Sequence, residues 1–381
     1  MPISDEGTPV HVIGAGPGGL AVAAALRRRG VSAVVLERSD AVGASWRNRY
    51  DALRLHTTRR RSALPGLAVP RGYGRWVGRD DMVRYLESYA DDHHLELAAG
   101  VEVHRIERRG EEWVLHANGG RRLTTPAVVV ATGLHRTPYL PDWPGRGGFR
   151  GDLLHSAHYR DPAPYRGKDV LVVGAGNSGT EIAVDLARGG AARVRLAVRT
   201  PPHLVRRSWL GWPAQSGGTL CRRLPRWAVD AGARRIAAPD LTAHGLPRPK
   251  GGLGTRLREG AVPVVDSGDF VRAVRAGEVE PVAGVEAFEG EDKIRLLDES
   301  VIAPECVVAA TGYRRDLDGL VGDLGVLDAL GAPRVRRRGR AAEGAPGLYF
   351  TGFTSPPSGT LREIGREAER VAKSIARASA K

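Results

Sequence analysis

A glycine-rich stretch near the N-terminus has the residue types and the spacing of a phosphate-binding turn. The apolar run VHVI leads into GAGPGG, in which Gly14, Gly16 and Gly19 stand in G-x-G-x-x-G register. Such glycines let a strand turn sharply into a helix, bring bare backbone against a pyrophosphate and aim the helix N–H groups at it. Residues 20–26 are good helix formers, so the stretch predicts a strand, a turn and a helix that bind a dinucleotide.

The strand expected after this helix, residues 31–36, ends at Glu37. A carboxylate at that point suits the two hydroxyls of an unmodified ribose and would repel a 2′-phosphate. The first glycine stretch is therefore expected to bind FAD or NAD.

A second stretch repeats the pattern in the middle of the chain. The apolar run DVLVV leads into GAGNSG, where Gly174, Gly176 and Gly179 stand in the same register. The strand expected next, residues 193–198, ends in Arg199 instead of an acid. A guanidinium there can bind a 2′-phosphate through two hydrogen bonds, which favours NADPH over NADH; the alternative is one more solvated arginine.

Two further features accompany the glycine stretches. Ser178 and Glu181 have the spacing of a capping box at the start of the second helix. Thr132–Gly133 and Thr311–Gly312 each follow an apolar run, and small residues at such points let the chain reverse close to a cofactor. These short repeats support a cofactor site at the end of each run.

Charge, cysteine content and hydropathy exclude several function classes. The chain has 57 basic and 43 acidic residues, but the arginines are spread along it, so we expect no nucleic-acid binding. Its two cysteines lack C-x-x-C spacing, which argues against a dithiol redox centre. No apolar run is long enough to span a bilayer and the N-terminus lacks a signal-peptide pattern, so we expect a cytoplasmic protein. The residue pattern predicts no metal site and leaves the oligomeric state open.

Apolar periodicity predicts the remaining elements. Helices are expected at 83–90 and 360–376, buried strands at 126–131, 306–310 and 348–352, and strands of a small antiparallel sheet at 95–103 and 112–116. The Gly- and Pro-containing segment 145–169 is interpreted as a linker into a second domain. Residues 201–260 show no repeating unit and are interpreted as an insertion on the substrate side. At 381 residues the chain is long enough for two domains.

One flavin site and one NADPH site in a single chain imply hydride transfer from nicotinamide to flavin. The missing cysteine pair excludes a disulfide reductase, so the electrons are expected to pass to oxygen, a quinone or a protein carrier. The residues alone leave these three acceptors open.

The segment before the second glycine stretch carries a specific motif. FRGDLLHSAHY matches F-x-G-x-x-x-H-x-x-x-[Y/F] through Phe149, Gly151, His155 and Tyr159. This is the identifying motif of the flavin-containing monooxygenases, which the sequence resembles over nearly its whole length. SWRNRYDALRLHT, MVRYLESYA, VPVVDSGDFVRAVRAGEVE and VVAATGYRRD are similar to the YUCCA-like branch and its bacterial relatives. Baeyer-Villiger relatives carry Trp at the position of Tyr159, which makes that chemistry less favoured.

The resemblance implies an α/β fold with two Rossmann-like dinucleotide-binding domains, in which the NADPH-binding domain is inserted into the FAD-binding domain. The FAD-binding domain would comprise residues 1–163 and 306–381. The NADPH-binding domain would comprise residues 164–305, with the substrate-side insertion at about 201–260.

The resemblance also implies a reaction. NADPH would reduce FAD, O2 would add at flavin C4a to form a peroxide or hydroperoxide, and one oxygen atom would pass to a small-molecule substrate in a pocket that excludes water. Oxygenation at nitrogen or sulfur is expected slightly ahead of YUCCA-like oxidative decarboxylation of a 2-oxo acid, and Baeyer-Villiger oxidation is also open. An NADPH-dependent flavin reductase or oxidase and a non-catalytic flavin redox sensor are the remaining alternatives.

Residue by residue, the resemblance assigns the two cofactor sites. The FAD motif and the flavin-lining loops fall on Gly14, Gly16, Pro17, Gly18, Gly19, Glu37, Arg38, Trp46, Arg47, Thr132 and Gly133, and the NADPH motif falls on Gly174, Gly176, Asn177, Ser178, Gly179 and Arg199. Thr360 and Leu361 would begin a helix whose N-terminal dipole faces the flavin pyrimidine edge. The four residues of the identifying motif would hold the domain junction, so that loss of His155 or Tyr159 would harm NADPH use more than FAD content.

His56 is the one residue to which the resemblance gives a catalytic role. It stands in LRLHT, where the animal enzymes have an asparagine beside C4a and the Baeyer-Villiger enzymes an aspartate. An imidazole there could protonate the peroxide or hydrogen-bond to it, or could pack against the isoalloxazine.

Overall fold

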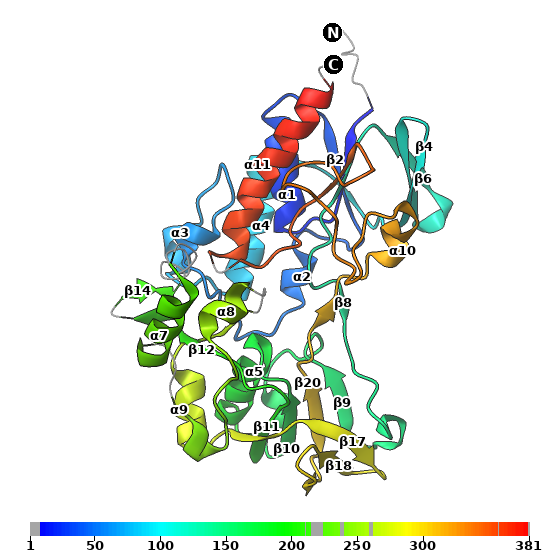
Figure 1. The fold of residues 1–381 in the computed structure, drawn as a ribbon. Coiled ribbons are helices and arrows are strands. Elements are labelled where there is room, and N and C mark those ends of the chain that lie inside the picture. The colour runs from blue at the N-terminus through cyan, green and yellow to red at the C-terminus, as the bar shows by residue number, and fades with distance from the viewer. Residues whose placement is uncertain are drawn as a thin grey trace. The chain divides into compact units, whose positions relative to one another are not determined.

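The computed structural model describes residues 8–209, 211–214, 224–236, 240–258, 262–356 and 358–379, which fold as two compact units (Figure 1). Unit 1 contains Met1–Arg47, Thr57–Thr137 and Tyr313–Lys381, and unit 2 contains Asn48–His56 and Pro138–Gly312. Unit 2 is therefore inserted into unit 1 along the chain. The short segment Asn48–His56, which we call the strap, belongs to unit 2 although unit 1 sequences flank it on both sides.

Unit 1 is built on a five-stranded parallel sheet. Its strands in spatial order are β22 (Leu348–Phe350), β7 (Val128–Val130), β1 (Val10–Ile13), β2 (Ala33–Glu37) and β3 (Glu96–Ala99). β1, β7 and β22 are buried along their whole length, because apolar strands in the middle of a parallel sheet have both faces covered. The strands predicted at 126–131 and 348–352 are thus confirmed.

Two helices of unit 1 lie side by side, in blue and red in Figure 1: α1 (Pro17–Arg27) and α11 (Thr360–Ser379). Residues 18–26 of α1 are all buried, and many of them are glycine or alanine, whose small side chains let α11 pack closely. A third helix, α4 (Arg79–Asp92), also packs on α1. The structure confirms the helices predicted after the first glycine stretch and at the C-terminal end.

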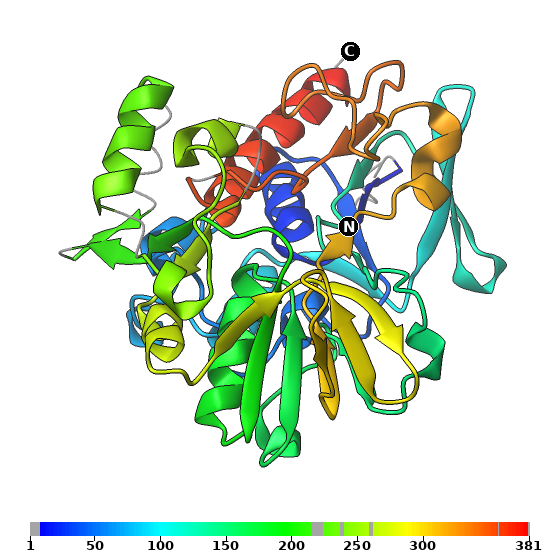
Figure 2. The same cartoon turned by 60° about the horizontal axis from the view of Figure 1, so that its bottom comes forward.

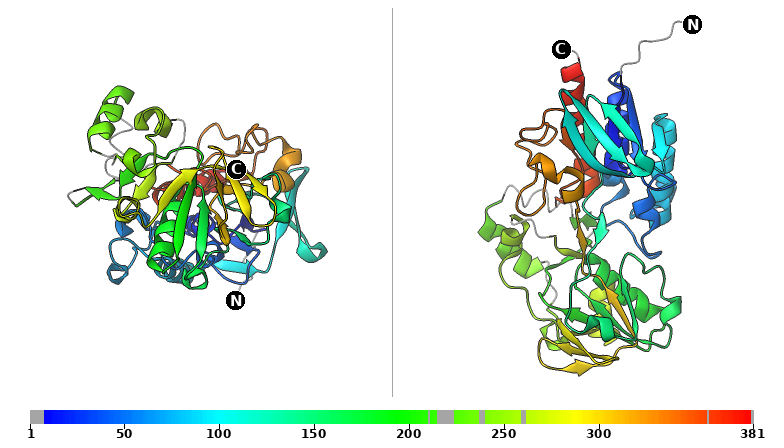
Figure 3. Two further views of the ribbon diagram at one scale, coloured as in Figure 1. Left: turned by 90° about the horizontal axis from the view of Figure 1, so that it is seen from below. Right: turned by 90° about the vertical axis from the view of Figure 1, so that its right-hand side faces the viewer.

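A three-stranded antiparallel sheet, cyan in the right-hand view of Figure 3, belongs to unit 1 and consists of β4 (Val103–Arg109), β5 (Glu112–Ala117) and β6 (Arg122–Thr125). Its residues Ile106, Trp113 and Leu115 share a core with Leu36 of the parallel sheet. The prediction of one antiparallel strand at 95–103 is wrong. Residues 96–99 pair with β2 in the parallel sheet, and the partner of β5 begins only at residue 103.

Short elements complete unit 1 and the connections. They are α2 (Ala44–Arg47), α3 (Arg59–Ser62), η1 (Arg71–Tyr73), η2 (Asn118–Gly120), α10 (Asp318–Val321), η6 (Gly322–Leu324) and the two-stranded pair of β8 (Thr137–Pro138) with β21 (Tyr313–Arg314).

Unit 2 repeats the plan with a second five-stranded parallel sheet. Its strands in spatial order are β16 (Glu280–Ala283), β11 (Arg193–Val198), β10 (Asp169–Val173), β20 (Cys306–Ala309) and β9 (Asp152–His155). The strands that sequence analysis predicted around the second glycine stretch and at 306–310 are present.

Alternate side chains of β10 enter two different cores of unit 2. Val170 and Val172 pack with α5 (Asn177–Arg188) and α9 (Asp269–Arg275). Leu171 and Val173 instead pack with a three-stranded antiparallel sheet, which consists of β17 (Val285–Glu289), β18 (Lys293–Leu296) and β19 (Val301–Ile302) and is yellow in Figure 2. Because side chains alternate along a strand, the helices cover one face of the parallel sheet and the antiparallel strands cover the other.

The insertion expected at 201–260 is described in part. It contains two short strand pairs. In one, β12 (Leu204–Arg206) pairs with β15 (Val264–Asp266), which follows the insertion, and in the other β13 (Ser208–Trp209) pairs with β14 (Trp212–Pro213). Its helices are α7 (Arg226–Ile236), η5 (Thr242–His244) and α8 (Leu253–Arg258). Two 3₁₀ turns, η3 (Arg146–Gly148) and η4 (Ala163–Tyr165), precede β10.

The units divide the chain at other positions than the predicted domains do. Residues 48–56, 138–163 and 306–312 are expected in the FAD-binding domain from the sequence, whereas they lie in unit 2. For the last two segments the reason is strand pairing, since β9 and β20 extend the sheet that β10 begins. The segment interpreted as a linker thus contributes an edge strand, which its glycine and proline content hid.

Candidate nucleotide-binding and active sites

The first glycine turn of unit 1 has no room for side chains at two positions. A Cβ on Gly14, whose φ is +107°, would lie 2.9 Å from the carbonyl oxygen of Ala131, and one on Gly19 would lie 1.9 Å from that of Gly14. Gly16 differs, because a Cβ there would meet no protein atom within 4 Å. The turn is therefore closed against the neighbouring strand and open on the side of Gly16, where the N-terminus of α1 can receive a phosphate.

Glu37 lies beside this turn at the end of β2, and hydrogen bonds fix its carboxylate. Oε2 accepts a hydrogen bond of 2.7 Å from the amide of Ala15, and Oε1 accepts bonds of 3.0 and 2.6 Å from the amide and hydroxyl of Ser39. The side chain is buried, whereas the neighbouring Arg38 is exposed. An ordered carboxylate next to a glycine turn fits the ribose hydroxyls of a dinucleotide.

Two Thr-Gly turns stand at the same edge of the unit 1 sheet. Thr132–Gly133 follows β7 and Thr351–Gly352 follows β22, and the glycines have φ of +79° and +81°. The hydroxyl of Thr132 is buried and has no hydrogen-bond partner in the described part of the chain, which leaves it available to a bound cofactor. Thr351–Gly352 was missed by sequence analysis, although a Thr-Gly pair after the apolar run LYF is the same signal as at the two predicted turns.

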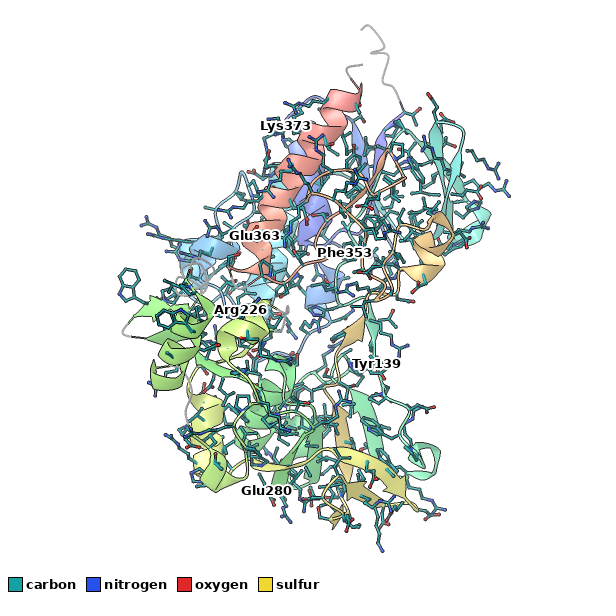
Figure 4. The ribbon with its side chains drawn as sticks, viewed as in Figure 1. Tyr139, Arg226, Glu280, Phe353, Glu363 and Lys373 are labelled. Carbon is teal, nitrogen blue, oxygen red and sulfur yellow. The ribbon has the colours of Figure 1, made fainter. Side chains whose placement is uncertain are left out.

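Thr351–Gly352 is held by a buried carboxylate on α11. Oε2 of Glu367 accepts a hydrogen bond of 3.1 Å from the Thr351 hydroxyl and one of 2.9 Å from the Gly352 amide. Nearer the helix start, Glu363, labelled in Figure 4, accepts hydrogen bonds from Ser358 and from Arg366. The first turns of α11 are therefore tied to the loop that precedes them.

The other residues predicted for the first site have mixed surroundings. α11 begins at Thr360, as predicted, and Leu361 packs in the core. Trp46 is half-buried on α2, and Arg47 on the same helix is exposed and pairs with Glu87. The roles of these residues toward a flavin remain predictions.

The second glycine turn, in unit 2, reproduces the first. A Cβ on Gly174, whose φ is +109°, would lie 2.6 Å from the carbonyl oxygen of Ala310, and one on Gly179 would lie 1.8 Å from that of Gly174. A Cβ on Gly176 would again meet nothing within 4 Å. This turn is likewise open toward the N-terminus of its helix, so it also fits a pyrophosphate.

The capping box predicted from Ser178 and Glu181 is wrong. The N-cap of α5 is Gly176, which has no side-chain cap, and the helix begins at Asn177. Glu181 therefore lies more than one turn inside the helix and cannot reach the N-cap amide. The side chain of Asn177 is used elsewhere, since its Oδ1 accepts a hydrogen bond of 2.8 Å from the amide of Val265. Arg199 is exposed just after β11, as a residue that binds a phosphate would be.

The identifying motif packs inside unit 2. The ring of Phe149 contacts that of Phe288 at a centroid distance of 5.2 Å, and a Cβ on Gly151 would lie 2.6 Å from the carbonyl oxygen of Glu305. Both motif residues thus fix β9 against its neighbours. The predicted role of the motif at the domain junction remains a prediction.

His155 is locked in one neutral tautomer. Its Nδ1 accepts a hydrogen bond of 3.0 Å from the amide of Ala157, so the proton is on Nε2, which donates to the carbonyl of Gly312 at 2.9 Å. Burial lowers the pKa of His155. The histidine therefore fixes the Thr311–Gly312 turn at the end of unit 2.

Tyr159 anchors the C-terminal part of α5. It is fully buried, and its hydroxyl donates a hydrogen bond of 2.7 Å to Asp185. Burial, and then this hydrogen bond, raises the pKa of the phenol, while burial raises the pKa of the Asp185 carboxyl. The rings of Tyr50 and Tyr165 lie 6.3 and 5.6 Å from that of Tyr159, which brings the strap into the core of unit 2.

His56 lies at the end of the strap, beside α5. Its Nε2 is 3.1 Å from Oε1 of Glu181, and the hydroxyl of Tyr50 donates a hydrogen bond to the other oxygen of the same carboxylate. A cavity of about 450 Å³ within unit 2 is lined by His56, Glu181, Arg54, Arg207, Val184 and Phe270, among others. The structure thus places a histidine and a carboxylate together at the wall of a cavity.

Comparisons with known proteins agree with this geometry. The profile of the pyridine nucleotide-disulphide oxidoreductase family matches residues 11–209. Indole-3-pyruvate monooxygenase YUCCA1 of Oryza sativa subsp. japonica is 34% identical over 372 residues, which cover 96% of this chain and 90% of the relative. Probable indole-3-pyruvate monooxygenase YUCCA3 of Arabidopsis thaliana is 33% identical over 359 residues, which cover 90% of this chain and 81% of the relative. The chain belongs to the flavin monooxygenase family, in its YUCCA-like branch.

A solved flavin monooxygenase has the same fold. The flavin-containing monooxygenase from Stenotrophomonas maltophilia superposes with a TM-score of 0.74 at 25% identity, over 98% of this chain and 99% of that chain. As a member of the flavin monooxygenases, the chain is an oxygenase that uses a flavin and a nicotinamide cofactor. None of the helices in the described ranges is both long and apolar enough to cross a membrane.

Proposed function

We propose that this flavin monooxygenase carries out the oxidative decarboxylation of a 2-oxo acid with NADPH and O2. The observation that carries the proposal is the similarity, over at least 90% of the chain, to relatives named indole-3-pyruvate monooxygenases. In this reaction the 2-oxo acid, O2, NADPH and a proton give the carboxylic acid that is one carbon shorter, CO2, NADP⁺ and water. One oxygen atom of O2 enters the acid and the other enters water.

The two cofactors are proposed to be FAD in unit 1 and NADPH in unit 2. The carboxylate of Glu37 supports an unmodified ribose in the first site, and the exposed guanidinium of Arg199 supports a 2′-phosphate in the second. When bound, the reduced flavin supplies the chemistry that activates O2. The protein binds the pyrophosphates at the N-termini of α1 and α5, which are open beside Gly16 and Gly176.

The protein's own groups are proposed to manage charge and protons. The N-terminal end of α11, which begins at Thr360, favours negative charge on a flavin, and Thr132 offers a buried hydroxyl to it. His56 is proposed to exchange a proton in the oxygen-transfer step. The insertion at about 201–260, from which Arg207 lines the cavity, is proposed to shape the substrate side.

Oxygen labelling tests the proposal. Purified protein reconstituted with FAD is supplied with NADPH, ¹⁸O2 and an aromatic 2-oxo acid such as indole-3-pyruvate. The expected result is one ¹⁸O atom in the shortened acid and one CO2 per NADPH consumed. A panel of amines and sulfides is run in parallel, because oxygenation at nitrogen or sulfur was the first expectation from the sequence. Label found only in an N-oxide or a sulfoxide, or NADPH consumption that yields only hydrogen peroxide, would contradict the proposal.

A further inference from the structure

Helix α5 carries a carboxylate where the matching helix of unit 1 carries a methyl group. Glu181 stands two residues after Gly179, as Ala21 stands two residues after Gly19. Ala21 is completely buried, whereas Glu181 lines the cavity of unit 2. A small side chain is sufficient where a helix residue only packs against its neighbours, as Ala21 does. The carboxylate of Glu181 is therefore not explained by packing alone.

Both carboxylate oxygens of Glu181 contact the strap. The hydroxyl of Tyr50 donates a hydrogen bond to Oε2, and Nε2 of His56 lies 3.1 Å from Oε1. Tyr50 is 3% exposed. Burial, and then the charge of Glu181, raises the pKa of this phenol well above its usual range, so Tyr50 remains a donor. One oxygen of Glu181 is therefore fixed from within the core, which aims the other at His56.

This geometry selects the tautomer of His56. An ionised carboxylate only accepts hydrogen bonds, so a neutral His56 carries its proton on Nε2 and its lone pair on Nδ1. Nδ1 is buried and has no hydrogen-bond partner among the residues that the structure describes. Buried polar atoms are nearly always paired, so an unpaired ring nitrogen marks a place where a ligand atom can bind.

We propose that Glu181 is a positioning residue that forms an acid–base dyad with His56, in which Nδ1 of His56 takes a proton from a bound ligand and returns it. This inference rests on the proposed function. The carboxylate orients the ring and stabilises the imidazolium while the proton is held. Because the strap belongs to unit 2, the dyad is carried entirely by the unit that holds the second nucleotide turn.

The surroundings of the dyad contain further charged groups. Those that line the same cavity are Arg54 on the strap, Asp185 and Arg188 on α5, Arg207 after β12, Asp266 at the end of β15 and Asp269 at the start of α9. Asp269 pairs with Arg188, and Asp266 accepts the Phe270 amide. Glu181 is the carboxylate that contacts the imidazole directly.

Nitrogen-15 NMR of the histidine side chains tests the dyad without turnover. The spectra are recorded from the full-length protein with FAD bound, and His56→Asn identifies the His56 signal by its loss. We expect the proton of the neutral ring on Nε2 in the wild type. In Glu181→Gln we expect a mixture of the two tautomers, because the amide that replaces the carboxylate can donate to Nε2 as well as accept from it. A proton on Nδ1 in the wild type, or a tautomer that Glu181→Gln leaves unchanged, would overturn the proposal.

Kinetics with a matched control separate positioning from support of the fold. Tyr50→Phe removes the other hydrogen bond to the same carboxylate but keeps the charge opposite His56. We expect Glu181→Gln to lower kcat for oxygenation by about 100-fold, with a much smaller change in flavin reduction by NADPH. Tyr50→Phe is expected to keep the wild-type tautomer of His56 and to lower kcat much less.

Two outcomes are decisive. Equal losses of flavin reduction and of kcat in both variants, with the tautomer of His56 unchanged, would show that Glu181 only holds the strap and would overturn the dyad. If the wild-type protein oxygenates no 2-oxo acid but the NMR result holds, the proposed substrate class fails and the dyad remains supported.

Discussion

Units 1 and 2 place the same backbone geometry at one edge of a parallel sheet but differ in the side chains around it. In both units the glycine turn closes against the carbonyl of an alanine in a neighbouring Ala-Thr-Gly turn, and Gly16 and Gly176 are both open. The polar groups are not shared. Glu37 is buried and accepts three hydrogen bonds, whereas Arg199 is exposed at the matching strand end.

The helices after the two turns differ in the same way. α1 is buried along residues 18–26 beneath a neighbouring helix, while α5 presents Glu181 to the strap and to a cavity. The backbone geometry that a dinucleotide turn needs is therefore the same in both units. We expect the side chains around each turn to select the nucleotide.

The largest expected effect comes from filling the closed side of each turn. Gly19→Ala and Gly179→Ala place a Cβ 1.9 and 1.8 Å from a carbonyl oxygen, which costs more than about 2 kcal/mol locally. We expect Gly19→Ala to purify without flavin and Gly179→Ala to keep its flavin but to be reduced by NADPH more than about 100-fold more slowly. Visible absorbance and stopped-flow reduction measure the two outcomes.

Gly16→Ala and Gly176→Ala are the matched controls for this pair. Their Cβ atoms have room within the protein, so both variants should melt at the wild-type temperature while nucleotide binding weakens. If Gly179→Ala loses the flavin and Gly19→Ala keeps it, the assignment of the two cofactors to the two units is reversed.

Glu37→Ala is expected to have the next largest effect. It leaves the amide of Ala15 and both donors of Ser39 without their acceptor, so unit 1 should lose about 3 kcal/mol of stability and most of its flavin. Chemical denaturation with FAD fluorescence as a second probe measures both losses. Glu37→Gln keeps one acceptor oxygen, so its stability and flavin content should lie between those of the wild type and of Glu37→Ala. Full flavin content in Glu37→Ala would contradict the role assigned to Glu37.

Arg199→Ala tests the nucleotide preference of the unit 2 site. Because the guanidinium is exposed, its removal should leave the melting temperature unchanged. The KM for NADPH should rise about 10-fold with little effect on NADH, since only NADPH carries the 2′-phosphate. Equal losses with both coenzymes would exclude Arg199 as the phosphate-binding residue.

The smallest expected effect is a shared loss of stability in mild acid. Burial lowers the pKa of His11 in unit 1 and of His155 in unit 2 below the usual 6.5, so folding favours their neutral forms. The stability they contribute is complete above pH 6.5 and is lost as the pH falls from there toward the lowered pKa values. The melting temperature should drop by a few degrees between pH 7 and 5.5. His155→Asn should flatten this slope, and an unchanged slope would contradict the role of His155.

Local patterns predicted the frame of both units. The strands before the glycine turns, the helices after them and the α11 helix follow from runs of apolar or helix-forming residues, whose consequences are short-range. The motif from Phe149 to Tyr159 predicted the family for the same reason, because its spacing can be seen without the fold.

Tertiary contacts account for what sequence analysis missed. The apolar stretch at 95–103 gives no sign that the chain turns at Gly100. Residues 96–99 before the turn join the parallel sheet, and the strand that begins at residue 103 joins the antiparallel sheet. The spacing of Ser178 and Glu181 fits a capping box, but the partners of Glu181 are His56 and Tyr50, and Tyr50 is 131 residues away in the sequence. No periodicity predicts that the strap belongs to unit 2.

The strap also limits how this protein can be recombined. A chimera that exchanges only Pro138–Gly312 with a homologue, for instance to trade one coenzyme for another, would leave Tyr50 and His56 behind to face a foreign α5. A chimera that exchanges unit 2 therefore has to exchange two separate segments together, Asn48–His56 and Pro138–Gly312.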